Sequence, residues 1–175
     1  MSRLVIRDAV RADAVHVGQH LRPGDRRELA RLGRGPGDVL LSFDAADVVR
    51  TIEAAGEPVA IFGRCPGKQP GVYLPWMLAT PGIDGVQRPF VLACKPELQQ
   101  LRQGCGWLYN LTHRENTAVV RWLRWLGFNF EARGHGPRGE FRLFWLPGVP
   151  NDGPASAPGG RDETTDSENR SEALQ

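Results

Sequence analysis

An abrupt change of composition after Leu146 limits what this chain can fold into. Residues 147–175 contain no aromatic residue, and their only large aliphatic residues are Val149 and Leu174. Such a segment cannot bury enough apolar surface to offset the entropy that it would lose on ordering. We therefore predict one folded domain at residues 1–146 and a disordered acidic tail at residues 147–175.

The same boundary divides the charge of the chain. The whole sequence has 22 Lys and Arg against 20 Asp and Glu, a formal net charge of +2. Two arginines and six acidic residues give the tail −4, so the folded part carries +6. This balance lacks the strong basic excess of a dedicated nucleic-acid binder. The arginines of residues 22–38 alternate with acids and have no aromatic platform, so we rank nucleic-acid binding last.

Several further features exclude other classes of protein. No apolar run approaches the roughly 20 residues that span a bilayer. Residues 1–8 become charged again after three apolar residues, too few for the core of a secretory signal. The three cysteines form no C-x-x-C pair, and His16 and His20 lack the partners of a zinc site. We expect a cytoplasmic protein without a membrane segment, a disulfide framework or a metal.

Hydrophobic periodicity alternates between strand and helix types over the predicted domain. The periods and turn signals predict strands at 4–7, 58–63, 72–78 and 107–111, helices at 9–21, 42–55, 85–103 and 116–126, and a hairpin of 129–133 with 140–146. Residues 22–38 are interpreted as a solvated helix and loop. This order of elements predicts an α+β fold with a mixed sheet.

Two prolines fall inside predicted elements. Pro75 removes a backbone donor, so its strand must lie at an edge, carry a bulge or break. Pro96 either kinks the helix predicted at 85–103 or begins a new helix after Lys95.

Residues 107–146 carry the most distinctive pattern of the chain. A strand leads to Asn116, and Gly127 and Phe128 follow eleven and twelve residues later, ahead of a hairpin. This pattern resembles the C-terminal half of the GNAT acyltransferases. The resemblance implies a mixed, mostly antiparallel central sheet flanked by helices, with a C-terminal β-hairpin.

The resemblance also indicates where coenzyme A would bind. GNAT enzymes hold its pyrophosphate in an R/Q-x-x-G-x-G/A loop before a long helix, where backbone N–H groups favour an anion. Residues 80–89 take that position and contain Gly82 and Gly85, at a different spacing. Pro81 removes one donor, and Asp84 would lie beside the phosphates. Gly82 and Gly85 are the candidate phosphate-binding residues.

The remaining GNAT positions give candidate residues for catalysis. The tyrosine that commonly protonates the leaving thiolate is replaced by Leu123. Tyr109 and His113, with Glu115 beside them, are the candidate acids or bases, and Asn116 is a candidate cofactor contact. Structural roles are open to the same residues: Tyr109 in the core, His113 and Asn116 as helix caps.

A closer resemblance is to a family of small internal virion or head-assembly proteins of T7-like phages. The likeness lies in the aromatic strand at 107–111, the alternation Arg121-Trp122-Leu123 and the final strand at 139–144. It implies a protein that contacts other virion proteins, without a cofactor, in the host cytoplasm during assembly or in the virion.

The helix at 117–126 carries a candidate surface for such a contact. Its apolar arc must face the sheet, whereas Trp125 falls outside that arc beside Arg121 and Arg124. A tryptophan between arginines has the composition of an interface hot spot, so these three are candidate partner-binding residues. The alternative is that Trp125 packs under a neighbouring loop with an arginine on its ring.

Two functional hypotheses result. The first is a phage internal virion or head-assembly protein on a GNAT-like fold that has lost catalytic activity and acts through protein contacts. The second is an active N-acyltransferase that transfers an acetyl group from acetyl-CoA to an amine.

Overall fold

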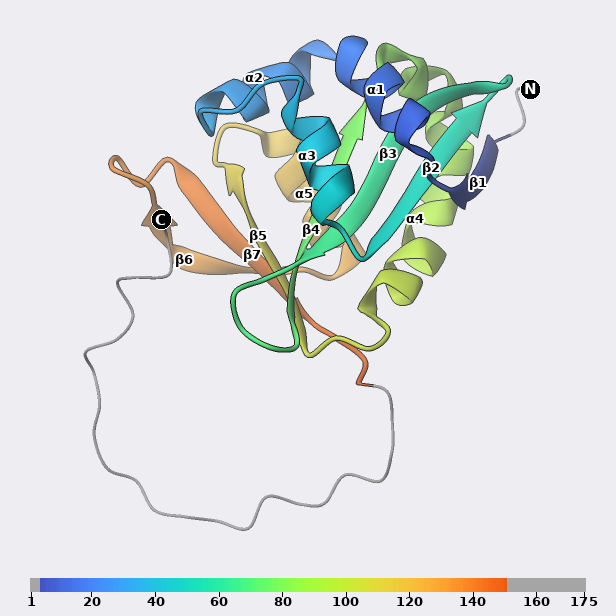
Figure 1. The fold of residues 1–175 in the computed structure, drawn as a ribbon. Helices are drawn as coiled ribbons and strands as arrows, with labels where there is room; N and C mark the ends of the chain where they lie inside the picture. The colour runs from blue at the N-terminus through green and yellow to red at the C-terminus, as the bar shows by residue number, and fades with distance from the viewer. Residues whose placement is uncertain (1–3, 151–175) are drawn as a thin grey trace, which may run out of the picture.

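The computed structural model describes residues 4–150, which form a seven-stranded sheet with helices on both faces (Figure 1). The elements in chain order are β1 Leu4–Asp8, α1 Arg11–Gln19, α2 Pro23–Arg31, α3 Asp38–Ala45, β2 Val48–Ala54, β3 Glu57–Pro66, β4 Val72–Ala79, the 3-10 helix η1 Pro81–Val86, α4 Gln87–Arg102, β5 Trp107–His113, α5 Thr117–Leu126, β6 Asn129–His135 and β7 Phe141–Pro147. The strand order is β1-β2-β3-β4-β5-β7-β6, and only the β4–β5 pair is parallel. The predicted α+β class with a mostly antiparallel sheet is confirmed.

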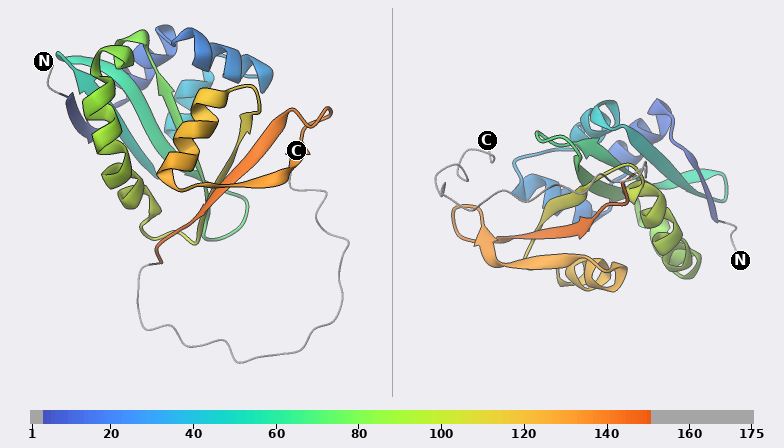
Figure 2. Two further views of the ribbon diagram at one scale, coloured as in Figure 1. Left: turned by 180° about the vertical axis from the view of Figure 1, so that it is seen from behind. Right: turned by 90° about the horizontal axis from the view of Figure 1, so that it is seen from below.

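The helices form two layers around the sheet. In Figures 1 and 2, α1, α2 and α3 lie on one face, and α4 and α5 on the other. Three clusters of buried side chains join these layers: α1 and α3 against β3, η1 and α4 against β2 and β3, and α5 against β5 and β7. No helix within residues 4–150 is long and apolar enough to cross a membrane.

The helix predicted at 42–55 is wrong for all but its first residues, 42–45. Helix α3 begins after Gly37 and ends at Ala45, and β2 follows from Val48. The run of Val48, Val49, Thr51 and Ile52 is rich in β-branched residues, which lose side-chain freedom in a helix and pack well on a sheet. Thr51 and Ile52 are both buried in β2, so tertiary packing on the central strands decides the local structure here.

The predictions for the second half of the chain are largely confirmed. Helix α4 runs through Pro96 without interruption, so no new helix begins there. Gly127 ends α5 in the left-handed conformation, with φ 101°, and β6 and β7 form the expected hairpin. Packing continues past β7, because Val149 exchanges backbone hydrogen bonds with Arg102 and Gly104. Residues 151–175 of the predicted tail lie outside the described residues.

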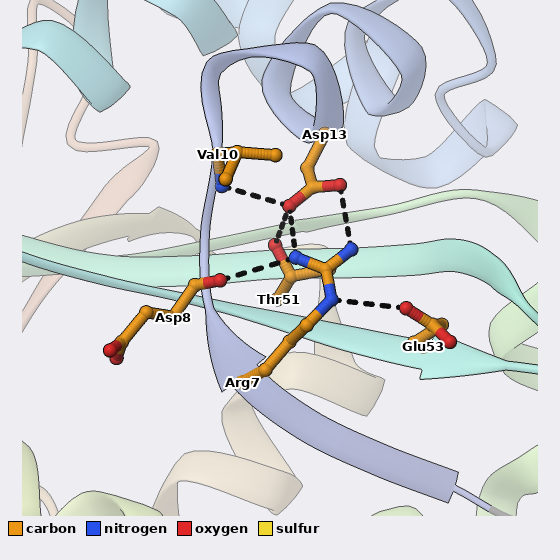
Figure 3. Close-up of polar contacts among 6 residues, drawn as sticks. All are labelled: Arg7, Asp8, Val10, Asp13, Thr51 and Glu53. Carbon is orange, nitrogen blue, oxygen red and sulfur yellow. Dashed lines mark hydrogen bonds and ion pairs between the residues drawn. The ribbon is translucent and has the colours of Figure 1, made fainter.

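A buried carboxylate fixes α1 to the first two strands (Figure 3). Asp13 accepts hydrogen bonds from both terminal nitrogens of Arg7 (2.6 and 2.9 Å), from the Thr51 hydroxyl (2.8 Å) and from the Val10 N–H (2.9 Å). Arg7 also donates to Glu53 at 3.0 Å. Burial alone would raise the pKa of Asp13, but these hydrogen bonds outweigh it and hold the pKa below its ordinary value.

The lowered pKa of Asp13 predicts an acid-dependent loss of stability. Because the folded-state pKa lies below the unfolded value of about 3.9, the contribution is fully present near neutral pH and disappears as the pH falls through the folded-state pKa. Asp13→Asn should cost about 1–3 kcal/mol at pH 7 and much less at pH 2. Urea unfolding of both proteins from pH 2 to 7 measures this, and a difference that is constant with pH would contradict it.

Candidate functional site

The two central parallel strands part soon after they meet. Strands β4 and β5 pair only at Val72 with Trp107 and at Tyr73 with Leu108. Beyond these two pairs the strands diverge, as Figure 1 shows between the green β4 and the yellow-green β5. The rest of β4 and the rest of β5 are therefore not paired with each other, and this unpaired stretch of the sheet is called the opening below.

Pro75 explains where the strands part. Asn110 of β5 donates its side-chain amide to the Pro75 carbonyl at 2.9 Å, so the backbone of Pro75 faces β5. The N–H that proline lacks would face the same edge, because the two groups of a strand residue point to one side. Of the three arrangements predicted for Pro75, the structure shows the edge position. At Pro75 the side of β4 that faces β5 is an unpaired strand edge, although β4 lies inside the sheet.

The edge of β4 beyond Pro75 remains open at Met77. Thr80 donates its N–H to Val59 on the β3 side, whereas Ala79 and Pro75 use their backbone groups on the opposite side. Strand alternation therefore turns the N–H and C=O of Met77 toward the opening. Strand β5 has no residue in register with Met77, so this donor and acceptor are available to another extended chain.

The start of α2 closes one end of the opening. The Arg22 N–H donates to the Ala79 carbonyl at 2.8 Å, and Asp25 accepts the Ala79 N–H at 2.8 Å. Asp25 also accepts from the Arg22 side chain at 2.8 Å and is only 7% exposed. This burial raises the pKa of Asp25. The interpretation of residues 22–38 as a solvated segment is therefore wrong for the face of α2 that carries this carboxylate.

Glu28, one turn later on α2, binds the end of β5, on the other side of the opening. Its carboxylate accepts the backbone N–H of His113 (2.7 Å), the Thr112 hydroxyl (3.1 Å) and the Asn116 amide (3.3 Å). Asp25 and Glu28 thus attach one helix to β4 and to β5. Asn116 is the residue before α5, as predicted, but its side chain does not cap that helix, because it is turned toward Glu28.

The structure does not bring the two candidate acid–base residues together. His113 is 8% exposed, and its Nδ1 accepts hydrogen bonds from Arg31 (3.0 Å) and the Glu115 N–H (3.3 Å). A neutral His113 therefore carries its proton on Nε2. Tyr109 is half-buried in register with Trp145, four residues back along β5. At about 3.3 Å per residue, the two backbones lie about 13 Å apart along the strand.

The two glycines of the predicted phosphate loop have different surroundings. A Cβ on Gly82 would lie 2.8 Å from the Val59 side chain, and the Gly82 N–H already donates to the Thr80 hydroxyl. Packing against β3 is thus sufficient reason for a glycine at position 82. Gly85 is exposed and has open space around its Cα, so packing within the protein does not require a glycine there.

Helix α4 begins beside Gly85 without a side-chain cap. Val86 occupies the N-cap position, no acidic residue lies in the first turn, and the exposed Arg88 does. A cation at a helix N-terminus is unfavourable beside the helix dipole, unless an anion binds there. Gly85 and the first turn of α4 are therefore the part of the predicted loop that could receive a phosphate, with the exposed Asp84 as an opposing charge beside it.

The candidate partner-binding residues lie together on α5. Trp125 is 44% exposed, and the Lys95 ammonium of α4 lies 4.6 Å from the centre of its ring. Arg124 lies over Phe130 at 5.4 Å, and Arg121 is exposed. The cation on the tryptophan is thus a lysine from the neighbouring helix, not an arginine, and the partner-binding role stays a prediction.

Among residues 4–150, no three His, Cys, Asp or Glu side chains lie close enough together to hold a metal ion. Leu123 stands at the position where GNAT enzymes commonly carry a tyrosine. Its side chain is buried in the cluster beneath α5, so this position has a structural role in the core.

Solved structures with a similar fold include several acetyltransferases. A diaminobutyrate acetyltransferase from Paenibacillus lautus is 17% identical with a TM-score of 0.61, over 87% of this chain and 99% of that one. A putative acetyltransferase from Salmonella typhimurium is 15% identical with a TM-score of 0.58, over 88% and 99%. A GNAT phosphinothricin acetyltransferase from Sinorhizobium meliloti is 14% identical with a TM-score of 0.58, over 83% and 88%. No protein-family model and no curated protein matches the chain.

These likenesses show that the chain has the fold of the GNAT acetyltransferases. At these identities they show the fold alone, so the activity must be argued from the chain's own residues.

Sequence reasoning missed three residues that shape the opening: Asp25, Glu28 and Asn110. A signal for the first two was present, because Asp25, Glu28 and Leu29 share one face of a helix whose leucine is buried. Asn110 gave no comparable signal, because a polar residue in a strand is usually solvated.

Proposed function

We propose that this protein is an N-acyltransferase that transfers an acetyl group from acetyl-CoA to an amine. The observation that carries the proposal is the parting of β4 and β5, which leaves the backbone of Met77 facing an opening in the sheet. An open strand edge of this kind binds an extended chain through backbone hydrogen bonds. The pantetheine arm of coenzyme A is such a chain, since it contains two amides.

The residues that follow β4 in the chain fit the rest of the donor. Gly85 and the uncapped first turn of α4, with Arg88, would hold its phosphates. When bound, acetyl-CoA supplies an activated thioester carbon that an amine can attack. The Met77 N–H would hold the arm that carries it.

An attacking amine must also lose a proton. The predicted acid–base residues, Tyr109 and His113, remain proposals. Asp25 joins them, because burial raises its pKa and its carboxyl group lies at the end of the opening. Raised carboxyl pKa values of this kind suit acid–base chemistry.

A second candidate function is a non-catalytic assembly protein. Two backbone N–H groups near the end of β4 already have acceptors within the chain, so they are not available to a cofactor. The Ala79 N–H donates to Asp25, and the Gly82 N–H donates to the Thr80 hydroxyl. The exposed Trp125 would then contact a partner. The acetyltransferases described above give no support to a virion role, which rests on the sequence resemblance.

Calorimetric titration of the full chain with acetyl-CoA separates the two functions. We expect micromolar binding that Gly85→Asp weakens at least tenfold, because the new carboxylate would repel the phosphates. Gly37→Asp is the matched control, since Gly37 is also exposed, open and next to a helix N-terminus, but lies on the other face of the sheet. Absence of binding at millimolar acetyl-CoA would overturn the acyltransferase proposal and favour the assembly protein.

A further inference from the structure

A basic hollow lies beside the β5 end of the opening. It has a volume of about 500 Å³ and lies between the end of α2, the β5–α5 connection and the β6–β7 turn. Its charged lining residues are Arg31, Arg114, Arg138, Glu115 and Glu140. Figure 1 shows these three segments gathered on one side of the molecule.

The two carboxylates of the hollow already have partners. Glu115 lies 3.0 Å from the Arg31 guanidinium, and Glu140 accepts the backbone N–H of Arg138 at 2.8 Å. Hydrogen bonds to backbone N–H groups hold the pKa of Glu140 below its ordinary value, so it stays ionised. Each acid therefore has a fixed place at the wall of the hollow.

Two of the three guanidinium groups form no such bond, although the positive charge of Arg138 contributes to the lowered pKa of Glu140. Arg114 and Arg138 are exposed, and within residues 4–150 neither side chain forms a hydrogen bond or ion pair with a carboxylate. Arg31 is different, because Glu115 and His113 hold it in place. The hollow thus contains two exposed arginines from separate segments, Arg114 and Arg138, and a third arginine, Arg31, that is held by its neighbours.

The hollow adjoins the proposed reaction site through His113. The backbone N–H of His113 is bound by Glu28, which closes the β5 side of the opening, and Arg31 follows Glu28 by three residues on α2. Phe141 packs edge-on against the His113 ring and gives the hollow an apolar wall. A small molecule held by the arginines could therefore reach toward the opening.

We propose that this hollow binds the carboxylate or phosphate group of the acyl acceptor, so that the substrate is a small amine that carries an anion. Planar guanidinium groups match both anions with paired hydrogen bonds. The volume suits a small-molecule ligand. This inference rests on the proposed acyltransferase function, and the experiment below separates the two.

The experiment has a binding arm and an activity arm, both on the full chain. Titration with inorganic phosphate, followed by NMR, gives the affinity of the hollow for an anion. Acetylation of O-phosphoethanolamine, β-alanine and ethanolamine compares a phosphate, a carboxylate and no anion on similar amines. The variant is Arg114→Gln with Arg138→Gln, and the control Arg26→Gln with Arg133→Gln removes two other exposed arginines.

The variant should weaken phosphate binding at least tenfold and raise KM for one of the two anionic amines at least tenfold. KM for ethanolamine should be unchanged, and the control should resemble the wild type. The amine that responds identifies the anion as phosphate or carboxylate. Equal losses in variant and control, or no preference for an anionic amine in an active enzyme, would overturn this inference alone. Acetylation of no amine, with intact phosphate binding, would overturn the proposed function and leave an anion site.

Discussion

Replacing Arg64 with alanine should lower the free energy of unfolding by about 2–4 kcal/mol, because the change leaves one buried carbonyl and several half-buried acceptors without their donor. Arg64 is only 7% exposed. Its guanidinium donates to both carboxylate oxygens of Asp47 and to the backbone carbonyls of Leu101 and Gln103, at the end of α4. It also lies over the Tyr73 ring at 4.4 Å, so one side chain joins β3, β4, α4 and the segment before β2.

Urea unfolding at pH 7 measures this effect. Arg64→Lys keeps the charge but loses the planar fork, so it should recover only part of the loss. Arg26→Ala removes an exposed arginine and should change the free energy by less than about 0.5 kcal/mol. A loss below about 1 kcal/mol in Arg64→Ala would show that these buried hydrogen bonds contribute little to stability.

Replacing Met77 with proline should reduce acetyl transfer at least 100-fold while the chain still folds. The N–H of Met77 faces the opening and not β3, so proline removes a donor that the sheet does not use, as Pro75 already does two residues earlier. This N–H is proposed to position the arm that carries the thioester, and a misplacement of about 1 Å of a reacting group can cost about 10²-fold in rate. The measurements are kcat/KM for acetyl-CoA and the melting transition.

Two matched variants separate the backbone from the side chain. Met77→Ala keeps the N–H but shortens the side chain, so its kcat/KM should stay within about threefold of the wild type. Leu78→Pro removes an N–H that faces β3, so it should unfold the chain. Equal activity in Met77→Pro and Met77→Ala would show that the edge of β4 does not hold the acyl donor.

Local signals made the second half of the fold predictable. The end of α5 requires a residue with a positive φ, which Gly127 supplies. The glycine-rich turn at 134–139 sets the final hairpin. Strand β2 was missed because a serine and two aspartates before it resemble a helix start, while its burial depends on pairing with β1 and β3. That pairing is a property of the assembled sheet.

The candidate site was less predictable than the fold. The sequence indicated the loop at 80–89, which follows the end of β4, and the strand at 107–111, which forms the other side of the opening. The contacts that close the opening join residues 54 to 88 positions apart, as between Asp25 and Ala79 or Glu28 and Asn116. A charge pattern on one helix shows that a face is polar, but not what that face will meet.

The amide of Asn110 has a consequence for how the site tolerates change. It crosses the gap between β4 and β5 where backbone pairing has ended, and its oxygen accepts the N–H of Leu111. One side chain of fixed reach therefore acts as a spacer between the two halves of the sheet. Together with Asp25 and Glu28, which attach α2 to the same two strands, this spacer sets the width of the opening.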